Sequence, residues 1–161
     1  MFAPDELIAA LSDGGVDYVL IGGLAVGAHG FPRATKDVDI VPAPDDANLS
    51  RLAEVLRVID AHNFGTGDFD PAEFPFAPRK AADLRAGGNF VLATRLGRLD
   101  LMQWVPGVPG DLAFEHLTRD AVETSLGGHP VRVCSRDDLI AMKRAAGRPQ
   151  DLLDLEQLGT S

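Results

Sequence analysis

Hydrophobic and polar positions follow two different periods along the chain, and these periods predict a mixture of helices and strands. Apolar residues three and four positions apart, with proline, acids or glycine at the ends, predict helices. The predicted helices cover residues 4–13, 23–29, 45–61, 136–146 and 148–158. Short aliphatic blocks bounded by glycine and proline predict strands. The predicted strands cover residues 17–21, 37–41, 89–94, 98–104, 121–126 and 130–134.

This order of elements predicts an α/β (α+β) fold in which helices flank a mixed β-sheet. The last four strands are expected to form two hairpins, turning at Gly97 and at Gly127-Gly128. No internal repeat or linker is evident, so residues 1–161 are predicted to form one domain. Residues 63–88 contain glycines and prolines without a clear period. They predict a long loop, with one helical turn near residues 80–85, of the kind that often forms a lid.

Composition narrows the class of protein. The chain has 161 residues, of which 45% are hydrophobic and 24% charged, as expected for a globular domain with its own core. No apolar run approaches the roughly 20 residues that span a bilayer. Residues 1–11 carry acids where a secretory signal carries basic residues, so we expect a cytoplasmic protein. The single cysteine, Cys134, excludes an internal disulfide and a cysteine-based zinc site.

The excess of acid changes the range of expected partners. The formal net charge is −9 at pH 7, whereas a surface that binds a long nucleic acid is normally basic. Basic residues gather at 79–80, 95–98 and 143–148, where each group is either a solvated face or part of a local phosphate-binding rim. Composition therefore favours a small nucleotide over a long nucleic acid, and it leaves the end of a tRNA open.

A glycine pair lies at the end of the first predicted strand. The apolar run Tyr18–Ile21 predicts a short buried strand, and Gly22-Gly23 ends it where a helix can begin. A turn without side chains lets backbone N–H groups approach a phosphate at a helix start. The pair can equally be a tight strand-to-helix turn with no ligand.

The next predicted strand alternates acids with aliphatic residues. Because side chains on a strand alternate between its faces, Asp37 and Asp39 point the same way while Val38 and Ile40 face the core. Two adjacent carboxylates repel each other, and a divalent cation between them removes that repulsion. Beside a glycine turn, this pair suggests metal-assisted phosphoryl or nucleotidyl transfer. The alternative is a solvated strand face.

A third acid lies on the later strand 98–104. Asp100 stands between Leu99 and Leu101, and an unpaired buried carboxylate costs several kcal/mol or becomes neutral. A metal shared with the earlier pair of aspartates would remove that cost. Three carboxylates from neighbouring strands suit Mg²⁺, which keeps waters and takes its other ligands from substrate phosphates. Alternatively, Asp100 forms a structural ion pair with Arg98 or Lys143.

This ordered set of residues resembles the polymerase-β-like nucleotidyltransferases. That family joins a Gly-Gly or Gly-Ser turn, a spacer, an Asp-x-Asp strand and a later strand aspartate. The stretch IGGLAVGAHGFPRATKDVDIV is similar to the small stand-alone members, which include the AbiEii-type toxins of bacterial toxin–antitoxin systems and related nucleotidyltransferase-like proteins. The C-terminal LIAMKRAAGRPQDLLDLEQL is similar to the lysine, arginine and aspartate run that closes the domain in this group. The resemblance covers about residues 15–158, least well at 63–88.

The resemblance implies a nucleotidyltransferase-like fold and an enzyme that transfers a nucleoside monophosphate from a nucleoside triphosphate to a hydroxyl acceptor. Two Mg²⁺ ions are expected. Asp37, Asp39 and Asp100 would be the metal ligands and the catalytic residues, with Asp100 also the candidate general base. The expected nucleotide-binding residues are Gly22, Gly23, Arg33, Thr35, Lys143 and Arg148.

Two of these residues can instead have structural roles. Arg148 and Asp151 lie three positions apart on a predicted helix, which favours an intrahelical salt bridge. Thr35 can cap the loop through its hydroxyl.

The acceptor and the partners stay open at the level of sequence. RNA, a protein or a small molecule can each supply a hydroxyl, and the resemblance adds a toxin–antitoxin component with an antitoxin partner, or a homodimer. The alternative is a catalytically inactive protein that binds a nucleotide or a partner. It is motivated by the short chain, because nucleotidyltransferases that act on large substrates commonly carry an additional helical domain.

Overall fold

The computed structural model describes residues 2–64, 80–109 and 112–159. The helices in this part of the chain are α1 (Pro4–Asp13), α2 (Gly22–Ala28), α3 (Asp46–Val58), α4 (Ala81–Arg85), α5 (Ala113–Arg119), α6 (Arg136–Ala146) and α7 (Pro149–Gln157). The strands are β1 (Tyr18–Ile21), β2 (Asp37–Pro42), β3 (His62–Asn63), β4 (Phe90–Thr94), β5 (Gly97–Leu101), β6 (Val122–Leu126) and β7 (His129–Val133).

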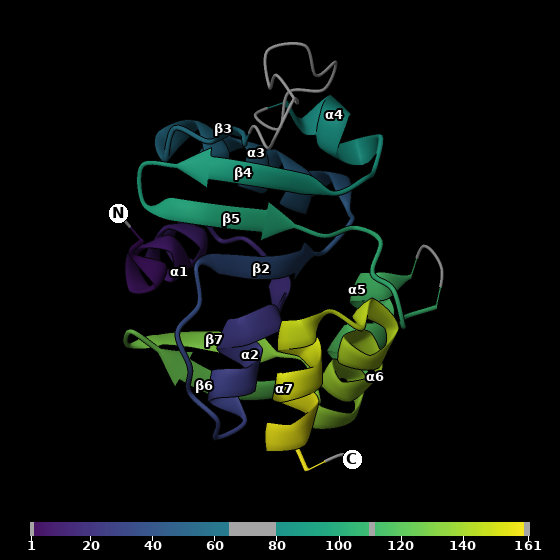
Figure 1. The fold of residues 1–161 in the computed structure, drawn as a ribbon. Coiled ribbons are helices and arrows are strands. Elements are labelled where there is room, and N and C mark those ends of the chain that lie inside the picture. Colours follow the sequence, from purple (N-terminus) through teal and green to yellow (C-terminus); the bar gives the residue numbers. More distant parts are fainter. Residues whose placement is uncertain (1, 65–79, 110–111, 160–161) are drawn as a thin grey trace.

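The strands form one mixed sheet in the order β3-β4-β5-β2-β1-β7-β6 (Figure 1). The pairs β4–β5 and β6–β7 are the two predicted hairpins. In the centre, β2 pairs antiparallel with β1 and parallel with β5, and β1 pairs parallel with β7. The predicted α/β (α+β) class with a mixed sheet is confirmed. The pairings β2–β5 and β1–β7 join strands that are far apart in the sequence.

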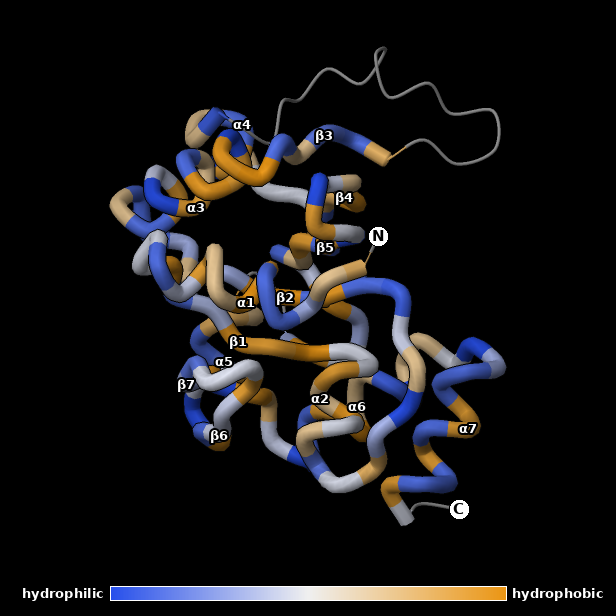
Figure 2. Tube along the Cα trace, turned by 90° about the vertical axis from the view of Figure 1, so that its left-hand side faces the viewer, coloured by the Kyte–Doolittle hydropathy of each residue, from blue (hydrophilic) through white to orange (hydrophobic). Residues whose placement is uncertain are grey.

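The central strand β1 lies in the interior of the molecule. All four of its residues are buried, and Figure 2 shows them as a continuous hydrophobic trace. This burial explains why β1 is an unbroken apolar run, one tyrosine and three aliphatic residues, instead of an alternating one. The helix α1 packs against β2 and β7, whereas α2 packs against β1, β2 and α6. No helix among the described residues is long and apolar enough to cross a membrane.

Local side-chain signals set the ends of the longer helices. At the start of α3, the Asp45 carboxylate accepts a hydrogen bond of 2.9 Å from the backbone N–H of Asn48. The Ser135 hydroxyl does the same for Asp138 at the start of α6, at 3.0 Å. Gly147 ends α6 in the left-handed conformation, with φ 62°. This turn returns the chain so that α7 packs against α6.

Two predicted elements end earlier than expected. The helix predicted over 45–61 stops at Val58, and the strand predicted over 98–104 stops at Leu101. After that strand, the Asn89 side chain takes over the backbone hydrogen bonds. Its Oδ1 accepts from the N–H groups of Gln103 and Trp104, at 2.9 and 3.1 Å. A side chain therefore replaces the strand ladder there.

Some elements were not predicted. The two-residue strand β3 is too short to show a period, and α5 buries only Ala113 and Leu117, too few positions for a helical pattern. In contrast, the helical turn predicted near residues 80–85, within the loop predicted over 63–88, is present as α4. The lid predicted for this region falls largely on residues 65–79, which lie outside the described part of the chain.

Candidate functional site

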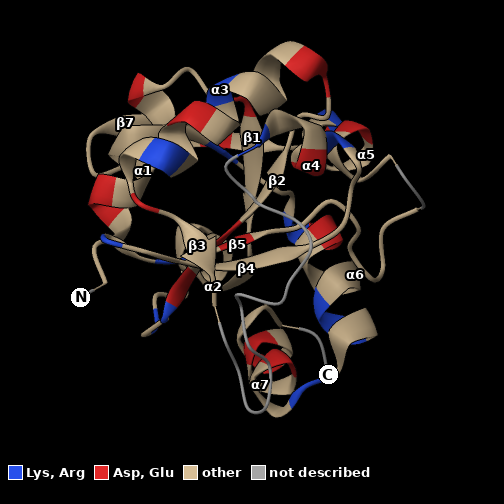
Figure 3. Cartoon of the chain, turned by 90° about the horizontal axis from the view of Figure 1, so that it is seen from above, with Lys and Arg blue, Asp and Glu red and all other residues tan. Residues whose placement is uncertain are grey.

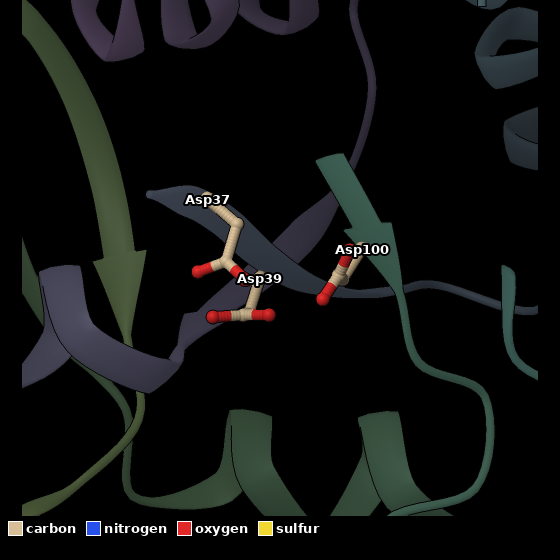
Figure 4. Close-up of side chains that lie close together, drawn as sticks. All are labelled: Asp37, Asp39 and Asp100. Carbon is tan, nitrogen blue, oxygen red and sulfur yellow. The ribbon is translucent and has the colours of Figure 1, made fainter. Parts of the chain in front are cut away.

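Three carboxylates meet where β2 runs beside β5. The parallel register places Asp37 opposite Arg98 and Asp39 opposite Asp100. One oxygen from each of the three aspartates lies within 4.8 Å of the others. Figure 4 shows the three side chains directed toward the same region, two from β2 and one from β5. On β2, the alternate residues Val38 and Ile40 are fully buried, as the alternation predicted.

The glycine pair is required by close packing around these acids. Gly22 has a left-handed φ of +74°, and a Cβ at this position would lie 2.1 Å from Asp39 Oδ2. A Cβ at Gly23 would lie 2.8 Å from Thr35 Oγ1 and 3.0 Å from an Arg33 guanidinium nitrogen. Both glycines therefore let side chains of the site rest directly against the backbone. The glycine pair therefore both makes the strand-to-helix turn and leaves room for the side chains of Asp39, Thr35 and Arg33.

The carboxylates carry poorly compensated negative charge. Burial, together with the charges of Asp37 and Asp100, raises the pKa of Asp39 to about 8. Burial also raises the pKa of Asp100, although Arg98 offsets part of this effect. Asp100 Oδ1 is buried and accepts no hydrogen bond from the described residues. A bound cation would give this unpaired carboxylate oxygen the partner that it lacks.

Arg98 is the cation nearest to the carboxylates among the described contacts. Its Nη2 lies 3.3 Å from Asp100 Oδ2 and 3.5 Å from Asp37 Oδ2, and its guanidinium lies over the ring of Phe64, 5.4 Å from the centroid. The alternative ion pair of Asp100 with Arg98 is therefore present. Arg98 itself was not among the predicted site residues. The signal was available, because it stands two positions before Asp100 and so shares its strand face.

A cationic wall formed by Lys143, Arg33 and Arg148 lies on the side of the site toward α7. Lys143 is buried, and its Nζ lies 3.0 Å from Asp151 Oδ1 and 2.9 Å from Asp154 Oδ2. Figure 3 shows the acidic positions of β5 and α7 in red and the basic positions of α6 in blue. The wall is thus held in place by acids from α7.

Two arginines complete this wall from outside the sheet. Arg33 donates two hydrogen bonds to the Asp154 carboxylate, at 2.8 and 2.9 Å. Arg148 donates from Nε to Asp151 Oδ2 at 2.7 Å, which is the salt bridge expected from their spacing. Its Nη2 also donates to Asp151 Oδ1, at 3.3 Å, and the Arg148 side chain is still 73% exposed.

The acids of α7 differ from the strand acids in their charge state. Burial alone would raise the pKa of Asp151, but hydrogen bonds from Arg148 and Lys143 outweigh it and hold the pKa below its usual range. The pKa of Asp154 is lowered in the same way, against burial, by Arg33, Lys143 and Gln150. Both carboxylates are therefore ionised and satisfied, and they anchor the wall.

A polar cavity of about 420 Å³ lies between the carboxylates and the wall. The residues predicted as catalytic, metal-binding or nucleotide-binding all line it: Gly22, Gly23, Arg33, Thr35, Asp37, Asp39, Asp100, Lys143 and Arg148. Further lining residues were not predicted: Ala34, Lys36, Arg98, Pro149, Gln150 and Asp151. Thr35 also donates a 3.3 Å hydrogen bond to the backbone oxygen of Asp37, which is its alternative, loop-capping role. The fold thus gathers the predicted residues, whose chemical roles stay predictions.

Comparison with known proteins identifies the fold. No protein-family model matches the chain, and no curated protein matches its sequence. The lincomycin-bound crystal structure of the lincosamide antibiotic adenylyltransferase LnuA is 15% identical, with a TM-score of 0.57, over 95% of this chain and 92% of that one. The crystal structure of ANT(2'')-Ia in complex with adenylyl-2''-tobramycin is 16% identical, with a TM-score of 0.52, over 95% and 86%.

A third match is an antigenic nucleotidyltransferase-like protein from Paracoccidioides brasiliensis. It is 18% identical, with a TM-score of 0.56, over 96% of this chain and 71% of that one. At such identities the likeness shows the fold alone. The chain has the polymerase-β-like nucleotidyltransferase fold that the sequence resemblance implied, and that prediction is confirmed.

Proposed function

We propose that the protein transfers a nucleoside monophosphate from a Mg²⁺-bound nucleoside triphosphate to a hydroxyl acceptor. The observation that carries this proposal is the meeting of Asp37, Asp39 and Asp100 at the edge of a cavity that the cationic wall of Lys143, Arg33 and Arg148 also lines. Acids and cations on facing walls suit a substrate that combines a divalent metal with a polyphosphate. The fold shared with the adenylyltransferase LnuA supports the same reaction class.

The three carboxylates fit a hard divalent cation. They offer oxygen ligands only, one of these oxygens has no hydrogen-bond partner among the described residues, and two of the groups have a raised pKa. When bound, Mg²⁺ would supply electrostatic stabilisation of the phosphates and acidify the acceptor hydroxyl. Two such ions are expected from the resemblance. Asp37 and Asp39 would hold one of them, and the same two residues together with Asp100 would hold the other.

The residues of the chain would divide the remaining work. Lys143 and Arg148, with Arg33 behind them, would neutralise the phosphates, while Gly22-Gly23 would let backbone N–H groups approach them. Asp100 would accept the proton of the acceptor hydroxyl as its oxygen attacks the α-phosphorus. The bond from the α-phosphorus to the bridging oxygen then breaks, and pyrophosphate leaves.

A small-molecule acceptor has the best support. The LnuA structure contains lincomycin and the ANT(2'')-Ia structure contains adenylyl-2''-tobramycin, so two proteins with this fold bind small hydroxyl compounds. The net charge of −9 disfavours a long polyanion. RNA and protein acceptors are therefore the less favoured outcomes of the same test.

The test is incubation with each of the four nucleoside triphosphates, labelled at the α-phosphorus, together with Mg²⁺ and a panel of antibiotics, RNA and proteins. We expect label to reach an acceptor and pyrophosphate to be released, and neither to occur with Asp39→Asn. If no label moves and calorimetry detects no binding of Mg²⁺ with nucleotide, the proposal is wrong. Tight nucleotide binding without transfer to any acceptor would instead identify the catalytically inactive alternative.

A toxin–antitoxin role, with an antitoxin partner, remains a narrower prediction from the sequence resemblance. Expression of the protein in a bacterial host should then arrest growth, and a neighbouring gene should relieve the arrest. Harmless overexpression of an active enzyme would count against this role. The predicted homodimer is tested separately by light scattering, which should give twice the chain mass of 17.1 kDa.

A further inference from the structure

A second cavity of about 140 Å³ adjoins the polar cavity at the carboxylates. The two cavities share several lining residues, including Asp39, Asp100 and Lys143. Every residue that lines the smaller cavity without lining the larger one is apolar, for example Ile21, Met102, Val105, Leu139 and Met142. We call this second space the apolar cavity. The two cavities thus share charged residues, among them Lys143 and Arg148, and the smaller one adds an apolar wall beyond the carboxylates.

The direction of β5 places the two cavities on opposite sides of Asp100. Residues Arg98, Asp100 and Met102 succeed one another on the same face, about 6.6–6.8 Å apart, because every second side chain shares a face. Arg98 lines only the polar cavity, Asp100 lines both, and Met102 lines only the apolar one. The Met102 backbone continues this extended path, since its N–H donates to the Ile40 oxygen at 2.9 Å.

The wall of the apolar cavity is preformed. Val105 and Leu139 are buried, at 4% and 1% exposure. The loop that carries Val105 is pressed against α6, because a Cβ on Gly107 would lie 2.6 Å from the backbone oxygen of Ala141. Gly107 has a φ of +87°, which also requires glycine. A cavity held this way does not need a ligand to form it.

In-line transfer assigns the two cavities to the two ends of the reaction. The attacking oxygen and the leaving pyrophosphate stand on opposite sides of the α-phosphorus. Lys143 and Arg148 line both cavities, whereas Arg33, Lys36 and Arg98 line only the polar one, so the polar cavity offers the leaving pyrophosphate more positive charge. We propose, on the basis of the proposed function above, that the apolar cavity is the acceptor subsite and that it receives a ring-sized apolar group next to the reacting hydroxyl.

The volume limits the size of that group. An apolar cavity of about 150 Å³ accommodates benzene, so about 140 Å³ suits one six-membered carbon ring or a branched chain of similar size. A hydroxyl attached to such a group would lie at the boundary where Asp100 can take its proton. The acceptor oxygen bonds to the α-phosphorus, pyrophosphate leaves, and the ester joins the apolar group to the nucleoside monophosphate.

Benzyl alcohol is a suitable probe, because it combines one apolar ring with one hydroxyl. Its binding to the full chain is measured by ligand-observed NMR in the presence of Mg²⁺ and a non-hydrolysable α,β-methylene analogue of ATP or of another nucleotide that binds. We expect millimolar binding that glycerol at equal concentration does not displace. With the hydrolysable triphosphate, the benzyl ester of the nucleotide should form faster than the glycerol ester.

Two variants test whether benzyl alcohol binds in the apolar cavity. Ala146 lies at the exposed rim of the apolar cavity, so Ala146→Phe should fill the cavity, and Met102→Gln should make it polar at nearly constant volume. Each should weaken benzyl alcohol binding by about tenfold or more. Ala47→Phe, on the exposed start of α3 and outside both cavities, is the matched control and should leave it unchanged.

The outcomes separate this inference from the proposed function. If Mg²⁺ with nucleotide does not bind the wild-type protein, the proposed function fails. If the nucleotide binds but benzyl alcohol does not, or binds equally to Ala146→Phe and Ala47→Phe, the acceptor subsite is wrong and the proposed function stands. Loss of nucleotide affinity in Ala146→Phe and Met102→Gln would likewise overturn the subsite, since it would assign the cavity to the donor base.

Discussion

Two groups of acids lie near the polar cavity, one on β2 and β5 and the other on α7, and they differ in the cations that contact them. The strand acids are Asp37, Asp39 and Asp100, for which the described contacts include one cation at 3.3 Å or more, Arg98. The α7 acids, Asp151 and Asp154, each bond to Lys143 and to an arginine at 2.7–3.0 Å. Accordingly, the pKa is raised to about 8 for Asp39 and lowered for both α7 acids.

The difference separates a binding role from an anchoring role. A buried carboxylate that the protein itself neutralises holds a helix and its cations in place. A buried carboxylate left without sufficient positive charge is costly to the protein alone, and the cost is removed when a cation binds. Strongly perturbed groups of this kind concentrate at functional sites. The contrast predicts opposite effects of removing charge from the two groups.

The largest effect is expected for Asp39→Asn. Loss of one carboxylate from the proposed metal site should lower nucleotidyl transfer by about 10²–10³-fold or more, measured as initial rates at saturating Mg²⁺. The free energy of unfolding without metal should not fall, because the substitution removes a carboxyl whose ionised form the folded protein disfavours, as its raised pKa shows. An Asp39→Asn protein that is inactive because it is unfolded would contradict this distinction.

The next effect is expected for Asp154→Asn. This change leaves Lys143 and Arg33 short of a partner, so urea unfolding should show a loss of about 3 kcal/mol, the lower end for a broken buried pair. The rate of nucleotidyl transfer should fall less than in Asp39→Asn, because a displaced cationic wall would weaken nucleotide binding without removing a carboxylate of the proposed metal site. If Asp154→Asn keeps full stability and loses activity as completely as Asp39→Asn, the two groups of acids do not differ as proposed.

A smaller effect is expected for Gly22→Ala. The left-handed backbone at φ +74° costs about 1–2 kcal/mol for alanine, and the new Cβ also displaces the Asp39 carboxylate. Gly87→Ala is the matched control, since Gly87 has a φ of +87° and nothing within 4 Å of a built Cβ. Both variants should lose similar backbone stability, while calorimetry should show weaker Mg²⁺ binding for Gly22→Ala alone. Equal Mg²⁺ binding by the two variants would show that Gly22 does not support metal binding by the carboxylates.

The smallest effect, counted per pH unit, is expected for the pH dependence of the unfolding free energy without divalent cations. The Asp39 carboxyl ionises near its ordinary pKa in the unfolded chain but only near pH 8 in the folded protein, so between about pH 4 and pH 8 the folded state holds the extra proton. This group's contribution to stability should therefore fall as pH rises, by at most about 1.4 kcal/mol per pH unit. Unfolding in urea with a chelator measures the slope.

Asp39→Asn provides the control for that slope. The variant lacks the titrating group, so its stability should change less steeply with pH than that of the wild type over the same range. Because Mg²⁺ favours the charged carboxylate, adding it should stabilise the wild type more at pH 8 than at pH 5. Parallel curves for the two proteins would assign the pH dependence to other groups.

Much of this site is visible in local sequence patterns. Alternation along β2 identifies Asp37 and Asp39 as neighbours on one face, and the buried positions between them confirm it. The glycine pair at the end of β1 marks a strand-to-helix turn for the same local reason. Helix ends at Pro4 and Gly147 follow from backbone chemistry that involves only a few adjacent residues. Such features depend on contacts within one turn or one strand.

Other features required the whole fold. The register that sets Asp39 beside Asp100 joins strands separated by four other elements, and the bond from Arg33 to Asp154 spans 121 positions. No local period encodes such pairings, because they form only when the helices and the sheet pack around a common core. The strand ending at Leu101 and the unpredicted helix α5 have the same origin, a tertiary context that outweighs local preference.

The sequence by itself determined which residue types were available and which face of its own element each would occupy. It placed three acids, a glycine pair and a basic C-terminal run on recognisable strands and helices. Only the tertiary structure decided which acids would be compensated: α7 folds its two acids onto Lys143, whereas the parallel pairing of β2 and β5 brings three acids together with too little positive charge. Face alternation is a property of a single strand, but charge compensation depends on distances between elements that only folding sets.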